Sequence, residues 1–158
     1  MSGESLLVRK IDWGTVLDHI PAWRANQVLK LLNLESLNRS SDISVIVLYN
    51  VPSKKLGRKD IVKLYHHMVS EEEAKILALV FPQMTINYIR DWKVEKHSPG
   101  LPEKIIGKIR CPETTCITNY EREPATPRYI VEREHGVVVC EYCDTLLEIS
   151  RIPDFLKG

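Results

Sequence analysis

The sequence predicts an α+β protein of two domains: an antiparallel sheet with two helices on one face (residues 1–98), then a small all-β domain (residues 99–158). Three observations lead to this prediction. Residues 1–98 follow the order β-α-β-β-α-β, which suits helices packed on one face of a sheet. The polar segment 96–102 contains Pro99 and Pro102. Beyond it, all four cysteines of the chain lie in two closely spaced pairs.

The first strands and the first helix follow from apolar periodicity. Residues 6–13 alternate apolar and charged side chains, so we expect a strand that Gly14 interrupts and that residues 15–20 resume. A broad apolar face predicts a helix over residues 23–34, which Asn33 can end. Residues 43–49 are mostly β-branched, as in a buried strand. After a lysine-rich turn at 52–57, residues 58–66 alternate again.

The second helix has a clear start signal. Ser70 is followed three residues later by Glu73, the pattern of a capping box, so the helix should begin near Glu71 and end before Pro82. Residues 85–94 are rich in β-branched and aromatic side chains and predict the last strand. Four strands and two helices in this order predict a ferredoxin-like sheet.

The cysteines form the patterns C-x₄-C, at Cys111 and Cys116, and C-x₂-C, at Cys140 and Cys143, behind an apolar strand at 137–139. Two such pairs can supply four thiolates to one tetrahedral Zn²⁺. The alternatives are two disulfides or a redox-active C-x₂-C. We see no signal peptide and therefore expect a reducing compartment, and a redox pair would leave the first two cysteines without a role. We predict a Cys₄ zinc-ribbon-like domain with one structural Zn²⁺ and no open coordination position.

The charge distribution argues against nucleic acid as a partner. The net charge is +1, but residues 1–100 carry 14 Lys and Arg against 11 Asp and Glu, and residues 101–158 carry 8 against 10. An acidic domain, made more negative by thiolates, is a poor match for a phosphate backbone. A nucleic-acid-binding zinc ribbon is nevertheless the alternative function. No apolar run approaches the roughly 20 residues that span a bilayer, so we expect a soluble, cytoplasmic protein without a membrane partner.

The first domain contains a cluster of basic residues that could meet phosphate groups. Lys59 and Lys63 are four residues apart on a predicted strand and therefore share a face, and Lys54, Lys55 and Arg58 lie nearby. The same cluster is typical of a solvated edge strand blunted by lysine. Because the chain lacks both common glycine-rich phosphate loops, the spacing is consistent with a triphosphate site but does not establish one.

The sequence allows more than one role for each of two pairs of adjacent polar residues. Neighbours on a strand point to opposite faces, so Asp18 and His19 are poorly placed to share a proton. Either both reach a ligand at the end of their strand, or they are a turn residue and a solvated imidazole. For the same geometric reason we interpret His66 and His67 as solvated and not as a metal pair. We find no catalytic constellation.

Taken together, the motifs resemble the regulatory chain of aspartate carbamoyltransferase over residues 8–149. The matching segments are 14–21 (GTVLDHIP), 57–64 (GRKDIVKL), 82–89 (PQMTINYI), 101–105 (LPEKI) and the C-x₄-C-I-T-N…C-E-Y-C frame. The resemblance implies a non-catalytic subunit of pyrimidine biosynthesis. It also implies an allosteric domain that binds CTP, often with UTP, as inhibitors and ATP as activator. The zinc domain would dock onto the catalytic chain, with regulatory chains paired as homodimers in a hetero-oligomer.

The resemblance also implies roles for individual residues. Ribose and phosphates would be contacted by Asp18, His19, Lys59 and Lys63. Lys96 would reach the triphosphate, Asn87 and Val94 would line the site, and backbone groups of Arg9, Lys10 and Ile11 would read the base edge. Trp92, where the family commonly has tyrosine, would line the nucleobase pocket or belong to the core. A shift of one residue would put His97 in the position of Lys96, and Glu113, Thr114 and Thr115 replace asparagines that the family often uses in docking.

Overall fold

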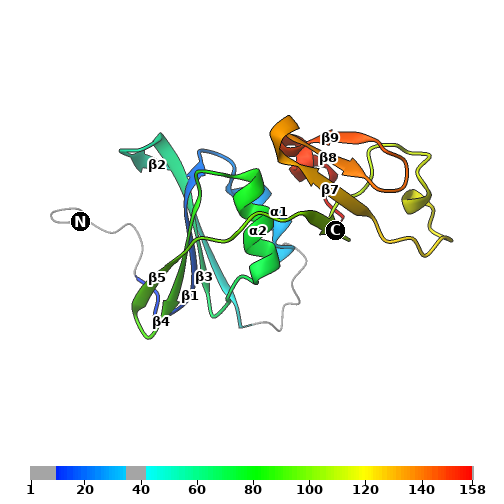
Figure 1. Cartoon of the computed structure of the whole chain (residues 1–158). Coiled ribbons are helices and arrows are strands. Elements are labelled where there is room, and N and C mark those ends of the chain that lie inside the picture. Colours follow the sequence, from blue (N-terminus) through cyan, green and yellow to red (C-terminus); the bar gives the residue numbers. More distant parts are fainter. Residues whose placement is uncertain (1–9, 35–41, 158) are drawn as a thin grey trace.

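The computed structural model describes residues 10–34 and 42–157, and its first domain is a five-stranded antiparallel sheet (Figure 1). The strand order is β2-β3-β1-β4-β5. Helices α1 and α2 cover one face of this sheet, as predicted (Figure 1). The bounds are β1 (Trp13–Pro21), α1 (Ala25–Leu31), β2 (Ser44–Ser53), β3 (Gly57–Tyr65), α2 (Glu71–Val80), β4 (Thr85–Arg90) and β5 (Lys93–His97).

The two helices follow their sequence signals to different degrees. The capping box is confirmed: the Ser70 hydroxyl accepts a hydrogen bond from the amide of Glu73, whose carboxylate accepts one from the amide of Ser70. Helix α1 is shorter than predicted. Trp23 has a left-handed φ of 69°, which places it in the turn before the helix, and Asn33, with φ 57°, follows its end. An asparagine tolerates that conformation well, so this end signal is confirmed.

The predicted interruption at Gly14 is wrong. Residues 1–9 lie outside the described residues, and residues 10–12 are not in a strand. Gly14 lies inside β1, opposite Tyr65 on β3 and Ile89 on β4. A Cβ atom built on it would lie 1.9 Å from the carbonyl oxygen of Leu64, and its φ is +145°. The glycine therefore permits a close approach of two strands and does not break one.

The prediction of a single strand over residues 85–94 is also wrong, because the chain forms a hairpin of two strands there. Strands β4 and β5 are joined by Asp91 and Trp92, whose φ angles are 50° and 67°. Two left-handed residues in succession form the type of two-residue turn that matches the twist of antiparallel strands. The usual sequence signal, a glycine, is absent. The hairpin adds a fifth strand to the predicted sheet.

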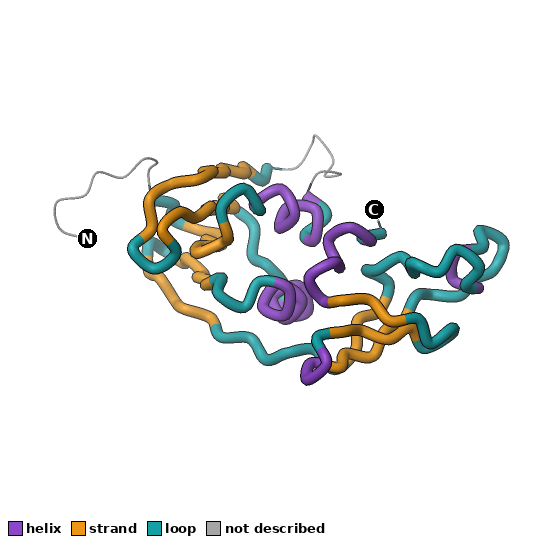
Figure 2. The backbone as a smooth tube through the Cα atoms, turned by 90° about the horizontal axis from the view of Figure 1, so that it is seen from above, coloured by secondary structure: helices purple, strands orange, loops and turns teal. Residues whose placement is uncertain are grey.

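The second domain is a four-stranded antiparallel sheet, in agreement with the predicted all-β class. Its strand order is β6-β7-β8-β9. Three 3₁₀ segments accompany the strands, and the last of them, η4, contacts α1 and α2. The helices therefore lie between the first sheet and the second domain (Figure 2). The bounds are β6 (Lys104–Ile106), η2 (Ile117–Asn119), β7 (Arg128–Glu132), η3 (Arg133–His135), β8 (Val137–Cys140), β9 (Leu146–Glu148) and η4 (Ile149–Phe155).

The apolar core is continuous across both domains. Alternate residues of the first sheet, such as Leu17, Val62 and Leu64, are buried against the helices, and the same cluster extends to Ile152 of η4. Two polar residues are fully buried among the described residues of this core, Thr15 and Asp60. No described helix has the length and apolar character needed to cross a membrane.

Asp60 acts as a clamp between α1 and β2. Its Oδ2 atom accepts a hydrogen bond of 2.9 Å from the amide of Ala25, the first residue of α1, and Oδ1 accepts one of 2.7 Å from the amide of Asn50. The carboxylate thereby satisfies two backbone donors that are far apart in the sequence. A buried donor left without a partner costs roughly 1–3 kcal/mol.

We therefore expect Asp60→Asn to lower the free energy of unfolding by about 1–3 kcal/mol, since an amide side chain has one acceptor oxygen for two donors. Chemical denaturation followed by circular dichroism measures this difference. Asp42→Asn, at an exposed position, is the matched control and should leave stability within about 0.5 kcal/mol of wild type. Equal stability of both variants would show that the clamp is unimportant.

Candidate functional sites: a cysteine cluster and the open face of the sheet

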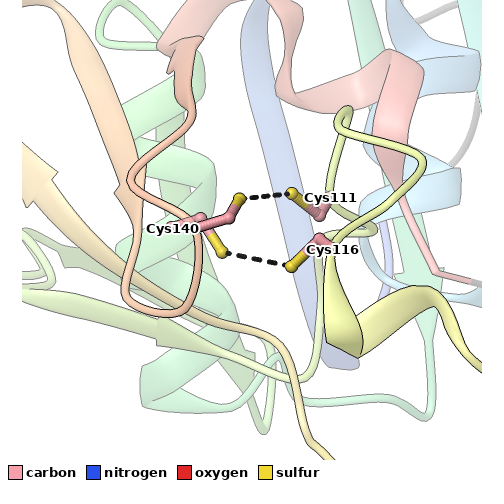
Figure 3. Close-up of side chains that lie close together, drawn as sticks. Cys111, Cys116 and Cys140 are labelled. Atoms are coloured by element: carbon pink, nitrogen blue, oxygen red, sulfur yellow. Dashed lines mark hydrogen bonds between the residues drawn. The ribbon is translucent and has the colours of Figure 1, made fainter.

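The four predicted cysteines converge in the second domain. Their Sγ atoms all lie within 4.8 Å of one another. The Sγ atoms of Cys111 and Cys143 are 3.6 Å apart. Those of Cys116 and Cys140 are 3.8 Å apart (Figure 3). A tetrahedron with metal–sulfur bonds of about 2.3 Å has edges of about 3.8 Å. The thiols are free, so the alternative of two disulfides is not formed.

Tight turns deliver both pairs of sulfurs. In the first pair, the amide of Cys116 donates to the carbonyl oxygen of Glu113, which closes the C-x₄-C loop. Strand β8 delivers Cys140, as predicted, and the amide of Asp144 donates back to its carbonyl oxygen. Asp144 has φ 62°, so the chain reverses directly after Cys143. The cluster is therefore built from two loops that meet across the domain.

The four cysteine thiols can all lose their protons only if a cation compensates the resulting negative charge. Burial raises the pKa of Cys111 to about 12 and also raises that of Cys140. Burial opposes ionisation of Cys116 too, but hydrogen bonds from the hydroxyl and amide of Thr118 outweigh it and lower the pKa to about 7. Four thiolates held this close together in a mostly buried site repel one another, so they cannot all form without a compensating charge. A divalent ion that prefers tetrahedral sulfur ligands fits this set of donors.

The second candidate site is the open face of the first sheet, the face opposite the helices. Strand register places Lys63 opposite Val16, Val16 opposite Asn87, and Asn87 opposite Lys96. Residues opposite each other on paired strands point to the same face. Three predicted site residues, Lys63, Asn87 and Lys96, therefore form one row across β3, β1, β4 and β5. Burial lowers the pKa of Lys63, while the nearby Asp18 carboxylate opposes this.

Asp18 and His19 both contact this face, contrary to the expectation that neighbours on a strand diverge. The pairing of β1 with β3 shifts between Leu17 and Ile20, and His19 has φ 57°, so the two residues form a bulge. Asp18 Oδ1 lies 2.9 Å from Nζ of Lys59, and His19 Nδ1 lies 3.2 Å from the hydroxyl of Thr85. The bulge therefore brings the contacts of both side chains to the same end of the open face.

A cavity of ≈ 350 Å³ opens at the other end of this face. Three predicted site residues line it, Lys10, Ile11 and Trp92. Trp92 lies in the β4–β5 turn and is 63% exposed, so the alternative of a core tryptophan is wrong. Val94 pairs with Ile89 in the neighbouring row and is also exposed. Arg9 lies outside the described residues.

Sequence reasoning missed several residues that line this cavity. Ile46 is paired with Lys63, and Ser44 with Tyr65, so strand β2 contributes to the site by its register. The alternation of side chains along β2 was the available signal. To use it, one must know that β2 pairs with β3 and in which register. The remaining lining residues are Asp12, Ser44, Ile46 and Tyr65.

The histidines are placed differently from the site residues. His97 lies on the helix-facing side of β5, where its Nε2 atom is 2.6 Å from Oε2 of Glu71 at the start of α2. His66 is exposed and stacks on Tyr65 with 4.0 Å between ring centroids, whereas Nε2 of His67 is buried. The prediction of two solvated histidines thus holds only for His66.

Comparison with known proteins identifies both domains. Residues 6–99 match the family model described as aspartate carbamoyltransferase regulatory chain, allosteric domain, and residues 103–153 match that chain's metal binding domain. Relatives named aspartate carbamoyltransferase regulatory chain include proteins from Thermofilum pendens (45% identical; 97% of this chain, 96% of the relative), Hyperthermus butylicus (46%; 98% and 96%) and Pyrococcus abyssi (45%; 93% and 95%). The chain therefore belongs to the family of aspartate carbamoyltransferase regulatory chains, with an allosteric domain and a metal-binding domain.

Proposed function

We propose that the open face of the first sheet binds a nucleoside triphosphate effector, CTP, UTP or ATP. The observation that carries this proposal is the row formed by Lys63, Asn87 and Lys96, beside a cavity lined by Ile11 and Trp92. Ammonium groups on one face can bind a chain of phosphates. A cavity of ≈ 350 Å³ is within the size range of small-molecule sites, about 300–1,000 Å³.

Within this proposal each group has a distinct role. The triphosphate lies over Lys63 and Lys96, with Lys59 held by Asp18 at the edge of the site. His19 and Asp18 contact the ribose and phosphates from the bulge in β1. The base enters the cavity, where backbone groups of Lys10 and Ile11 read its edge and Trp92 provides an aromatic surface for stacking. Asn87 and Val94 complete the walls.

We further propose that residues 99–158 dock onto the catalytic chain of aspartate carbamoyltransferase and that residues 1–98 form the nucleotide-binding domain. One Zn²⁺ held by Cys111, Cys116, Cys140 and Cys143 would stabilise the docking domain, because a metal with four protein ligands has no position for substrate. The chain would act in the cytoplasm as a homodimer of regulatory chains within the larger assembly. No part of this proposal gives the chain a catalytic role.

The arrangement supports allosteric coupling between the two domains. Helices α1 and α2 pack on the sheet with one side and contact η4 with another. A nucleotide that binds one quaternary state more tightly than the other shifts the assembly toward that state by the difference in binding free energy. The helices are the elements through which a movement of the sheet would reach the docking domain.

The phosphate assignment is tested by Lys63→Ala. Removing a charged hydrogen-bond donor should weaken CTP binding by about 1.5–3 kcal/mol, roughly 10- to 150-fold in Kd, measured by calorimetric titration of the zinc-loaded chain. Lys30→Ala on α1, which removes the same charge on the helix side, should leave the Kd unchanged. Unchanged affinity in Lys63→Ala would refute the assignment, and binding of a mixed-sequence RNA in place of CTP would favour a nucleic-acid-binding protein.

The two faces of β5 give a second test. Lys96→Ala should weaken CTP binding to a similar extent, because Lys96 shares the row of Lys63. His97→Ala should leave the Kd within about twofold and change stability by at most about 1 kcal/mol, because the His97–Glu71 pair is partly exposed on the opposite face. The reverse result, with loss of binding only in His97→Ala, would place the triphosphate on the other residue.

Metal removal gives a third test. Chelation should unfold residues 99–158 and release the catalytic chain, because this domain depends on the metal for stability. Nucleotide binding should persist, since the open face lies on the far side of the sheet from the second domain. Size-exclusion chromatography of the complex, with calorimetry on the released chain, measures both effects. A complex that survives complete metal removal would contradict the proposed role of the metal.

A further inference from the structure

The sulfurs of the cysteine cluster are surrounded by hydroxyl groups at matching positions. Thr118 follows Cys116 by two residues, and Thr145 follows Cys143 by two residues. The Oγ1 atom of Thr118 is 3.2 Å from Sγ of Cys116, and that of Thr145 is 3.1 Å from Sγ of Cys143. One threonine lies on each loop of the site, so the two pairs occupy equivalent places in the two halves of the cluster.

Tyr129, which pairs with Cys140 across β7 and β8, carries a third hydroxyl group. Tyr129 is fully buried, and its hydroxyl makes no well-formed hydrogen bond with another described residue. The two threonine hydroxyls are therefore the ones that the structure places within hydrogen-bonding distance of a cysteine sulfur.

The direction of these hydrogen bonds is set by the ionisation state of the sulfur. Without a metal, the Cys143 thiol donates to the hydroxyl of Thr145, and the bond between Cys116 and Thr118 can run in either direction. A metal-bound thiolate has no hydrogen and can only accept, so metal binding would reverse the first of these bonds. Both threonine hydroxyls must then donate. Four thiolates and one divalent ion carry a net charge of −2 in a mostly buried site, so each donated hydrogen bond lowers the free energy of the metal-bound state.

We propose that Thr118 and Thr145 are positioning residues that hold the metal by donating hydrogen bonds to the thiolates of Cys116 and Cys143. This inference rests on the proposed metal site, and it adds residues that neither bind the metal nor lie in the C-x₄-C and C-x₂-C patterns. The hydroxyls withdraw electron density from the sulfurs, so they slow both metal loss and alkylation of the thiolates.

The experiment compares isosteric variants of the full chain. Thr118→Val and Thr145→Val keep the shape of the side chain and remove the donor. We expect each to weaken Zn²⁺ binding by about 10- to 100-fold in competition with a chromogenic chelator, as is typical when an outer partner of a metal ligand is lost. Thr118→Ser and Thr145→Ser should restore wild-type affinity. Thr115→Val is the matched control, because the Thr115 hydroxyl contacts Glu113 and no sulfur.

A spectroscopic measurement separates electronic tuning from simple loss of packing. With Co²⁺ in the site, the sulfur-to-cobalt charge-transfer band should move to lower energy in the Val variants, because the thiolates become more electron-rich, and should return in the Ser variants. Unshifted bands with wild-type affinity, an equal effect in Thr115→Val, or failure of serine to restore the site would each overturn the proposal.

The wild-type protein provides a test that does not depend on the variants folding. Loaded with ¹¹³Cd, it should show couplings between the metal and the hydroxyl protons of Thr118 and Thr145, transmitted through the hydrogen bonds to sulfur. Bound ¹¹³Cd without these couplings would overturn the proposal while leaving the metal site intact. Failure to bind any divalent metal would instead refute the metal site on which the proposal rests.

Discussion

The structure depends on two helices that are buried on more than one side. Helix α1 is only seven residues long and has no side-chain cap at its start, so it could not persist by itself in water. It is stabilised because Val28 and Leu31 enter the same apolar cluster as the sheet and η4. Helix α2, with its complete capping box, packs in the same layer. The two domains are thereby joined through a shared core and not by their linker alone.

This packing explains which parts of the fold the sequence predicts. The capping box at Ser70 and the cysteine spacing act locally, so both are readable without knowledge of the rest of the chain. The hairpin at Asp91 and Trp92 is not, because its turn lacks glycine and its left-handed angles follow from pairing with β4. Gly14 is misread for a similar reason, since the strand that approaches it, β3, is fifty residues away.

The two candidate sites differ in the same way: local sequence patterns predict one of them, and the other depends on the pairing of distant strands. The metal ligands are found from two short patterns, and the structure only had to bring the loops together. The row of Lys63, Asn87 and Lys96 combines three strands whose order no local pattern reveals. Spacing along one strand singled out Lys63, but Asn87 was named only through family resemblance. The bulge at Asp18 and His19 reverses the simple rule of alternation, and only the register shift against β3 exposes it.

Lys96 and His97 are neighbours on strand β5, and the alternation of side chains along a strand places them on opposite faces of the sheet. Lys96 faces the open side of the sheet, while His97 faces α2. Substitutions at one position can therefore accumulate during evolution without disturbing the other. The length of the Asp91–Trp92 turn has no such freedom. Insertion or deletion of a single residue there would exchange the two faces, so that a histidine met the open side of the sheet and a lysine met the helix. Natural variation in this hairpin is thus expected in residue identity and not in residue number.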